Sequence, residues 1–471
     1  MMTPPPSQNH SSPHYSRQAS SSSSSSSKVV LDATTTTTAA TTDASDKYLG
    51  PFGLQLHNFQ DTGGRGVQSN VDRPVGELLL EIPVEDTITS SQLKSSSSVT
   101  TASDNDLFAV LFQHANGAEE RLAIELLRRR DQNKDPYIKE VLPKEHYNSI
   151  WTLPDDLWDA LRSKCLPRCY LETFQATRDR VMDFCTRMLA AQEQMKQPQQ
   201  PQKYSVDDFL WAFSMVRSRS VAVPELQPEA SDVAAATGDD NHLSQVPLAL
   251  IPGLDLLNHD FDKGSATQLQ LVKEEQKGND KDSKTSWWVS SNKPIEAGEQ
   301  VFLSYGDDKD NWKLLLTYGF AVSDNPNSLV FWSWRDLLDA ASKVRPTIFQ
   351  ERVCAQLLRH PQLQAYTTLS EDRATFSFDA KHKQPRESLS NGLVMLANLV
   401  TQLGQPSDDK IGDDVLRELI RQRIDDLQRC QEELEKQIKS IDDDDVKQRK
   451  GWIPFLGSLQ VAINQEEKDL T

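Results

Sequence analysis

The sequence predicts an α+β protein in which a small β-rich domain is split by a helical insert and followed by an all-α C-terminal domain. Short β-like runs lie on both sides of a long block with helical spacing, and helical spacing returns after about residue 323. We therefore expect five parts: a tail over 1–46, a first β part over 47–103, an insert over 104–215, a second β part over 216–323 and a C-terminal domain over 324–471.

The first part is rich in Ser and Thr, with homopolymer runs at Ser20–Ser27 and Thr34–Thr38. Such a segment buries too little apolar area to offset the entropy lost on ordering. It has no apolar stretch typical of a secretory signal. An organelle transit peptide stays open as an alternative, but the missing Arg-rich amphipathic pattern favours a disordered tail.

The next two parts differ in periodicity. Residues 63–83, GGRGVQSNVDRPVGELLLEIP, alternate short β-like runs with Gly and Pro. The insert then shows i, i+3, i+4 apolar spacing in LFAVLFQ, RLAIELLRRR, DDLWDALRSKCL and RVMDFCTRMLAA. A polar, Pro-containing stretch at 192–203 interrupts this spacing and predicts a loop.

Strand-like runs return in VPLALIPGLDLL, SWWVSS and EQVFLSYG, separated by polar stretches at 225–246 and 273–284 that we interpret as surface insertions.

The C-terminal part is predicted to be helical to its end. Its longest helix carries a heptad-like seam, with apolar residues at Ile420, Ile424, Leu427, Leu434, Ile438 and Ile441. The seam spans about three heptads, which favours packing within the chain over a dimeric coiled coil. Asp442–Asp445 then predicts a solvated acidic loop.

Composition narrows the function classes. The chain has 51 Lys and Arg against 69 Asp and Glu, a net charge of −18. This charge disfavours nucleic acid and anionic membranes as partners and suits a basic one. No apolar run reaches the length of a membrane span. Five Cys without zinc spacing indicate a reducing compartment, and no metal site is expected because His259 has no second His at ligand spacing.

The stretch IPGLDLLNHD, residues 251–260, places an acid inside an apolar run. A buried carboxylate costs several kcal/mol unless a partner compensates it. Either the segment is a strand that ends in an ordinary turn, or Asp255, Asn258 and His259 face a functional site.

Each of the other motifs, taken alone, is only weak evidence of a functional site. GGRG at 63–66 allows close approach of a ligand to the backbone, yet a simple β-turn explains it equally. VRSRSV at 216–221 reads as a cationic helix C-terminus. FLSYG at 302–306 and LLLTYGF at 314–320 each end in a Tyr-Gly pair, which is also common where a Tyr packs at a sheet edge.

The combination of these motifs, in this order, resembles the SET-domain protein methyltransferases of the Rubisco large-subunit methyltransferase class. The resemblance runs from about Leu49 to Phe320 and continues more loosely through the helical C-terminus, which resembles the substrate-binding domain of that class. The Asp-x-x-Asn-His and Ser-Tyr-Gly elements carry most of its specificity.

The resemblance implies S-adenosylmethionine as cofactor and assigns roles to the motif residues. It places the cofactor against Gly64, Arg65, Gly66, Ser218, Asn258, His259 and Tyr305. It makes Tyr305 the catalytic residue and implies a substrate pocket formed by Arg219, Asp255, Tyr318 and Phe320. A pairing of Asp255 with Arg219 would compensate the buried carboxylate.

The expected acceptor is a lysine of a non-histone protein. Histidine-methylating relatives have a Trp before the Asp and an Asn two residues after the Arg, where this chain has Leu254 and Val221. Histidine methylation, a non-catalytic SET-like binding module and a helical scaffold stay as alternatives. The chain is expected to act as a monomer on a protein partner, with neither nucleic acid nor membrane, in the cytoplasm in preference to a plastid or the nucleus.

Overall fold

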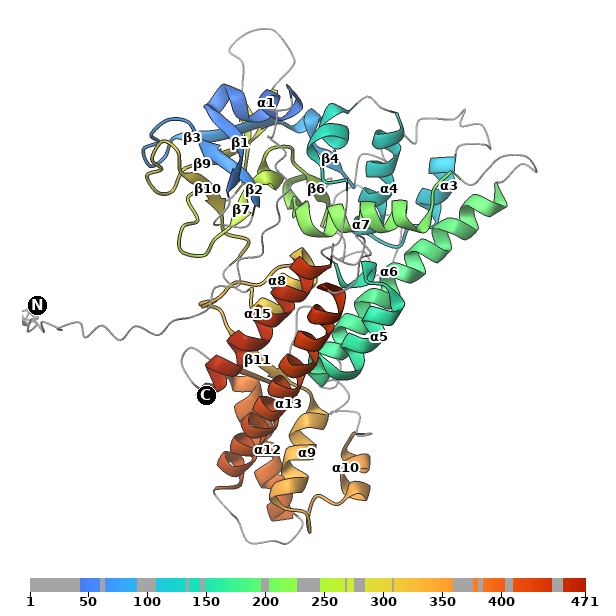
Figure 1. The fold of residues 1–471 in the computed structure, drawn as a ribbon, viewed down its shortest axis with the longest axis vertical. Helices are drawn as coiled ribbons and strands as arrows, with labels where there is room; N and C mark the ends of the chain where they lie inside the picture. The colour runs from blue at the N-terminus through green and yellow to red at the C-terminus, as the bar shows by residue number, and fades with distance from the viewer. Residues whose placement is uncertain are drawn as a thin grey trace, which may run out of the picture. The chain divides into compact units, whose positions relative to one another are not determined.

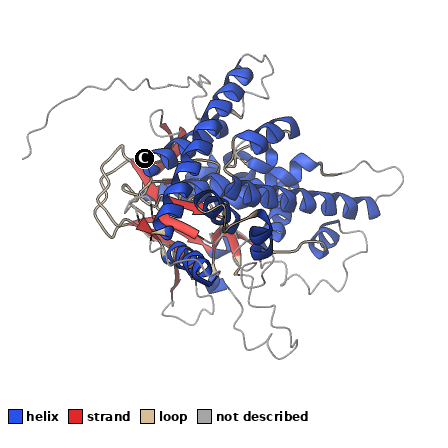
Figure 2. Cartoon of the chain, turned by 90° about the horizontal axis from the view of Figure 1, so that it is seen from below, coloured by secondary structure: helices blue, strands red, loops and turns tan. Residues whose placement is uncertain are grey.

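The structure is a computed structural model, and it describes 14 stretches of the chain. These are residues 43–59, 64–90, 107–132, 135–144, 149–195, 203–226, 246–266, 269–274, 284–306, 309–358, 376–379, 384–402, 410–442 and 452–471. Figures 1 and 2 show that helices make up most of this part, with the strands in short groups.

One four-stranded sheet joins the two β parts of the sequence. Its order is β1-β2-β10-β7, from β1 (Leu54–Phe59), β2 (Gly64–Ser69), β10 (Gln300–Leu303) and β7 (Asn258–His259). β10 pairs with β2 in antiparallel fashion and with β7 in parallel fashion. Strands from before and after the helical insert therefore lie side by side.

Two further sheets repeat this arrangement. β3 (Leu78–Pro83) pairs with β9 (Lys284–Ser290), which also pairs with β8 (Gln270–Glu274). β4 (Ile88–Thr89) and β5 (Val221–Ala222) both pair with β6 (Leu248–Leu250). The predicted β domain split by a helical insert is confirmed, and its strands form three small sheets.

The insert is helical, as predicted. It contains α3 (Leu107–Gln113), α4 (Ala118–Asp131), the short π-helix η4 (Tyr137–Val141), η5 (Ile150–Thr152), α5 (Asp155–Lys164), α6 (Arg168–Gln194) and α7 (Val206–Arg219). A capping box starts α7, because the Ser205 side chain accepts from the Asp208 amide while the Asp208 carboxylate accepts from the Ser205 amide. α7 extends past residue 215 and ends at Arg219.

The C-terminal part is mainly helical. After α8 (Asn311–Tyr318), which lies within the second β part, its helices are α9 (Trp334–Val344), α10 (Glu351–Leu358), α12 (Glu387–Gln402), α13 (Ile411–Asp442) and α15 (Ile453–Leu470). It also contains a three-stranded sheet, β11 (Leu329–Trp332), β12 (Phe376–Asp379) and β13 (Gln384–Pro385), so the expectation of an all-α domain was wrong. Strands of two to four residues are too short to show a clear period in the sequence.

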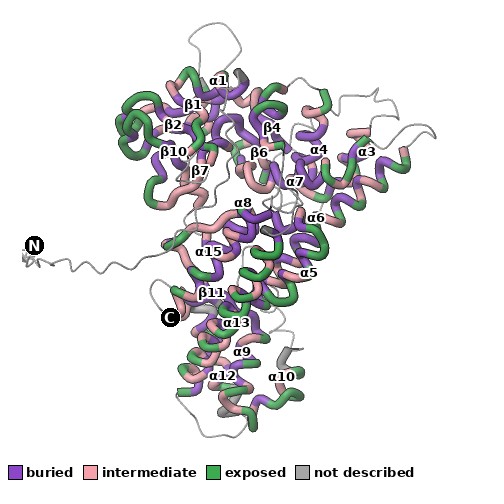
Figure 3. Tube along the Cα trace, viewed as in Figure 1, coloured by how far each residue is buried: buried purple, intermediate pink, exposed green. Residues whose placement is uncertain are grey.

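The long helix α13 packs inside the chain, which confirms the preferred interpretation of its seam. Leu427, Leu434 and Ile441 are buried, and α13 lies against α15, α9 and α12. Buried and exposed positions alternate along the helix in Figure 3. The other three residues of the predicted seam, Ile420, Ile424 and Ile438, are only partly buried, while Leu419, Arg423 and Cys430 are buried beside it.

The N-terminal boundary also differs from the expected one. A helix, α1 (Asp43–Leu49), begins inside the segment expected to be tail, and its Ala44 and Ser45 are buried. A seven-residue helix gives little periodic signal beside a Ser- and Thr-rich stretch.

Some predicted segments lie outside the described residues. These are the rest of that tail, most of the three polar stretches after 192, 225 and 273, and residues 443–445 of the acidic loop.

Helix α8 has well-defined ends, and these ends orient the segment that follows β10. The buried Asp310 caps its N-terminus, with Oδ1 accepting from the amides of Trp312 at 2.8 Å and Lys313 at 3.1 Å. Gly319 ends the helix in the left-handed conformation, with φ +78°. Burial raises the pKa of Asp310 to about 6, while its two amide donors oppose the shift.

Asp310→Asn should change how stability depends on pH. Because the pKa of Asp310 is higher in the folded state, wild-type stability from this group is greatest below about pH 4 and falls as pH rises through about 6. Asn keeps the accepting oxygen without the charge. The free energy of unfolding of the variant relative to wild type should therefore rise by up to about 3 kcal/mol from pH 4 to pH 7, measured by urea titration.

The control is Asp159→Asn, which removes an exposed carboxylate on α5. A difference between Asp310→Asn and wild type that stays constant across this pH range would contradict a buried, ionisable cap.

Candidate active site

The sheet brings two of the sequence motifs into contact. In the parallel pairing of β7 with β10, Asn258 lies opposite Phe302 and His259 opposite Leu303. On the other side of β10 lies β2, and the Asn258 amide nitrogen donates to the Arg65 carbonyl oxygen at 3.1 Å.

Gly66 is required by this contact. A Cβ built at Gly66 would lie 2.2 Å from Gln300 Nε2 and 2.8 Å from Asn258 Nδ2, both closer than real side chains approach. The absence of a side chain here lets Gln300 and Asn258 close over the strand.

The segment between β6 and β7 contains the acid of IPGLDLLNHD. It is not a continuous strand: Gly253 turns the chain with φ +88°, and Leu254–Leu256 form the short 3-10 helix η8. The expected strand was wrong here because a positive-φ Gly interrupts the apolar run. η8 leaves Leu254 and Leu256 buried and turns Asp255 towards α7 and η4.

Asp255 is a buried carboxylate, its side chain only 1% exposed. The Arg219 guanidinium donates to its backbone oxygen at 2.8 Å and lies 3.9 Å from Oδ2, so the predicted pairing is present at long range. The Tyr137 hydroxyl donates directly to Oδ1. Burial raises the pKa of Asp255, while Arg219 and Tyr137 act against that shift.

Tyr305 follows β10 and is held at both ends. Its hydroxyl donates to the Leu257 carbonyl oxygen at 2.8 Å, and its amide donates to His259 Nδ1 at 3.1 Å. His259 Nδ1 also lies 3.3 Å from the Leu303 carbonyl oxygen, so the ring is held against the end of β10. Burial raises the pKa of Tyr305, so the phenol stays protonated at neutral pH.

Aromatic rings surround Tyr305. His259 stacks on it with ring centroids 5.0 Å apart, and Tyr318 and Phe320 lie 4.6 and 6.2 Å away. Tyr318 is the last residue of α8, and Phe320 follows the left-handed turn at Gly319.

A hollow of about 190 Å³ lies where these segments meet. Its lining includes eight of the predicted site residues: Arg65, Ser218, Arg219, Asp255, Asn258, Tyr305, Tyr318 and Phe320. Gly64, Gly66 and His259 are not part of that lining. Gly66 packs under Asn258, and His259 lies behind Tyr305.

Sequence reasoning missed Tyr137 and Gln300, which contact the site, and Pro143, Ser149, Ser214, Met215 and Leu256, which line the hollow. Tyr137 lies 118 residues from Asp255, within a short π-helix without a motif of its own. Long-range contacts of this kind leave no local pattern in a single sequence. Only the Asp inside the apolar run indicated that some partner had to exist.

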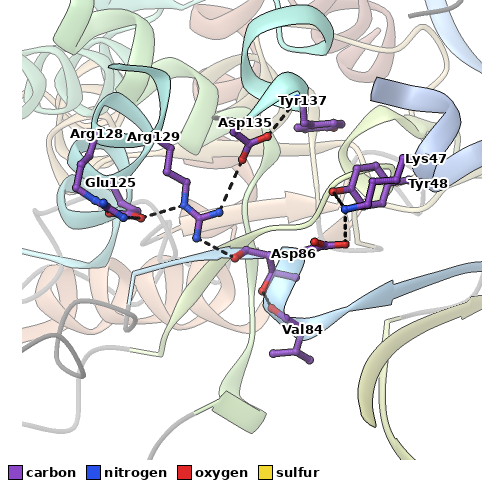
Figure 4. A network of polar contacts seen from close by, with 10 residues as sticks. Lys47, Tyr48, Val84, Asp86, Glu125, Arg128, Arg129, Asp135 and Tyr137 are labelled. Atoms are coloured by element: carbon purple, nitrogen blue, oxygen red, sulfur yellow. Dashed lines mark hydrogen bonds and ion pairs between the residues drawn. The ribbon is translucent and has the colours of Figure 1, made fainter. Parts of the chain in front are cut away.

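A second, larger hollow of about 610 Å³ lies among α1, η2 (Val84–Asp86), α4 and η4. Several of its charged groups already have partners, as Figure 4 shows. Arg128 donates twice to Glu125 at 2.6 Å, and Lys47 donates to Asp86 at 2.8 Å. The smaller hollow is the candidate active site because the motif residues converge on it.

Two classes of site receive no support from the described residues. No group of three or more His, Cys, Asp or Glu side chains there is placed to hold a metal ion. Nor does any helix in that part of the chain combine the length and apolar character needed to cross a membrane.

Comparison with known proteins agrees with the arrangement of these motifs. The SET domain family matches residues 64–306, just over half of the chain and the whole span from β2 to Gly306. The chain belongs to the SET-domain family. The α+β fold class expected from the resemblance is confirmed with it.

Similar SET proteins include "SET domain-containing protein 4" of Artemia parthenogenetica, 23% identical over 62% of this chain and 63% of that protein. The chloroplastic ribulose-1,5-bisphosphate carboxylase/oxygenase large subunit N-methyltransferase of Pisum sativum is 26% identical over 40% of this chain and 33% of that enzyme. The matched regions thus span less than two thirds of either relative. A solved SET domain of LSMT with lysine and AdoHcy aligns over 89% of this chain and 88% of that one, with 16% identity and a TM-score of 0.49.

Proposed function

We propose that this protein transfers a methyl group from S-adenosylmethionine to a lysine side chain of another protein. The observation that carries the proposal is the convergence of Tyr305, the aromatic pair Tyr318 and Phe320, and the buried Asp255 on one hollow of a SET domain. The pea relative, by its name, methylates a protein.

The residues present suit the cofactor. The Asn258 amide nitrogen is used by the Arg65 carbonyl, so its amide oxygen is the atom that can accept from an ammonium group such as that of a methionine moiety. Ser218 and Arg65 line the same hollow. When bound, S-adenosylmethionine supplies a methyl group on a positively charged sulfur, and aromatic faces with a nearby carboxylate favour positive charge.

The chain must also bring the acceptor amine into line with the donor and keep it neutral. Such alignment can contribute roughly 7–11 kcal/mol. A free Lys, with a pKa near 10.4, costs roughly 4.6 kcal/mol to deprotonate at pH 7. A hollow walled by Tyr305, Tyr318 and Phe320 lowers that cost, because desolvation disfavours the ammonium form.

Tyr305 orients the amine and does not act as a strong base. Its hydroxyl proton is committed to the Leu257 carbonyl oxygen, which leaves the phenol oxygen as an acceptor for an amine N–H. A raised pKa keeps the phenol neutral during the reaction.

Lysine is favoured over histidine as acceptor. Leu254 is buried in η8, and neither Leu254 nor Val221 contributes to the lining of the hollow. The hollow thus receives no hydrogen-bonding side chain from the two positions that distinguish the histidine-methylating relatives.

The partner is a protein, and we infer that the chain meets it as a monomer. The net charge of −18 favours a basic target surface over nucleic acid or an anionic membrane. The α13 seam is covered within the chain by α15 and α9, so it offers no exposed seam for a coiled coil. The C-terminal region is the proposed docking surface for the substrate.

Tyr305→Phe should lower methyl transfer by at least about a hundred-fold while cofactor affinity stays close to wild type. The variant keeps the ring and removes the hydroxyl that would position the amine. The measurement is incubation with tritiated S-adenosylmethionine and a cell extract, wild type beside variant, followed by mass spectrometry of labelled bands. Label on histidine would overturn the assignment of lysine, and a variant as active as wild type would remove Tyr305 from the reaction.

Gly66→Ala should weaken cofactor binding about ten-fold or more without unfolding the protein, because its Cβ displaces Gln300 and Asn258. Backbone strain is not the cause, since Gly66 does not have a positive φ. Calorimetry with S-adenosylhomocysteine measures the affinity. Gly457→Ala on α15, where a Cβ meets no atom within 4 Å, is the matched control. Equal affinities for the two variants would show that Gly66 and Asn258 do not form the cofactor site.

A further inference from the structure

Tyr137 lines the larger hollow and contacts a residue in the wall of the smaller one. Its ring lines the larger one, where Figure 4 shows it beside Tyr48 and Asp135, and its hydroxyl reaches Asp255 in the smaller one. It is therefore a direct link between the helical insert and the carboxylate of the candidate active site.

The surroundings of Tyr137 fix its position. The side chain is buried, and the Tyr48 ring packs edge-on against it with centroids 5.8 Å apart. The Tyr137 amide donates to Asp135 Oδ1 at 3.1 Å, which holds the start of η4. A residue held in this way presents its hydroxyl at one place.

Asp255 depends on that hydroxyl. Within the described part of the chain, Tyr137 provides the only side-chain hydrogen bond to the Asp255 carboxylate. Arg219 lies 3.9 Å from Oδ2, which is an ion pair without a hydrogen bond. The Gly253 amide lies 3.4 Å from the Tyr137 oxygen, so the hydroxyl also ties the turn before η8 to η4.

We propose that Tyr137 is a positioning residue of the methyl-transfer site, whose hydroxyl keeps Asp255 oriented and ionised opposite Arg219. The binding measurement that tests this role rests on the proposed function, because it uses S-adenosylmethionine as the ligand. The role adds η4 to the part of the helical insert that already meets the site, which is α7 with Ser218 and Arg219.

The charges around Asp255 give the proposal a measurable consequence. Arg219 from α7 and Arg65 from β2 face it with positive charge, and the titratable hydroxyls of Tyr137 and Tyr305 complete its surroundings. Loss of the Tyr137 hydroxyl favours the protonated form of Asp255. The hollow then becomes more positive, and this disfavours the sulfonium cofactor more than the product, whose thioether sulfur carries no charge.

The first arm of the test is Tyr137→Phe in the full chain, with S-adenosylmethionine affinity measured by calorimetry from pH 5 to pH 9. The affinity should fall as the pH is lowered, and in the variant this fall should begin about one pH unit higher than in wild type. Below that pH the variant should bind about ten-fold more weakly than wild type, and above it the two affinities should be nearly equal. S-adenosylhomocysteine should show a smaller change. The shift should vanish when Tyr137→Phe is made in an Asp255→Asn background.

Tyr48→Phe is the matched control, because Tyr48 packs on the same ring and its hydroxyl accepts from Lys47 without reaching Asp255. It should leave the profile unchanged. A Tyr137→Phe profile identical to wild type, or an equal change with and without Asp255, would overturn the proposal.

The second arm measures unfolding and needs no cofactor, so it separates failure of this proposal from failure of the proposed function. Tyr137→Phe should be more destabilising at pH 8 than at pH 4, because only the ionised Asp255 loses a partner. That pH dependence should disappear in the Asp255→Asn background. If Tyr137→Phe alone does not fold, recovery of folding in the double variant supports the proposal, and failure of both overturns it.

Discussion

The candidate site depends first on β10, which pairs with β2 along one edge and with β7 along the other. Four residues of strand thereby join segments that lie more than 190 positions apart in the chain. The pairing places Gly66 and Asn258 in contact, and it delivers Tyr305 directly beyond the end of the strand. A shift of one residue in this register would turn each of these side chains to the opposite face of the sheet.

The second constraint is electrostatic. Asp255 is almost fully buried, and its ion pair with Arg219 is too long to make a hydrogen bond. Buried ion pairs contribute little to stability, and a poorly compensated one costs free energy. A fold selected for stability alone would place an apolar side chain between Leu254 and Leu256. The carboxylate is instead held between α7 and η4 at the wall of the hollow, where it would face the positively charged sulfonium of the proposed cofactor.

The sequence was sufficient to predict the split β domain, because the longer strands and the helices of the insert carried a local period. It also placed eight residues around one hollow, since the motifs at strand and helix ends kept the spacing of a known family. The sequence was not sufficient for Tyr137 or Gln300, whose contacts with the site depend on distant segments. β11–β13 and α1 escaped prediction for a different reason, since elements of two to seven residues are too short to show periodicity. The interruption at Gly253 was missed because an apolar run looks the same whether it forms a strand or a short turn of helix.

The C-terminal region contacts α8, the helix that carries Tyr318. Trp312 of α8 donates to the buried Glu466 of α15 and stacks on Tyr170 of α6, with centroids 4.0 Å apart. Glu466 in turn pairs with the buried Arg423 of α13 at 3.4 Å. These contacts fix one end of the helix whose other end carries Tyr318. A C-terminal region that only docked a substrate would not need a buried charge pair at this junction. Removal of the region is therefore expected to disturb the aromatic wall of the hollow as well as the proposed docking of the substrate.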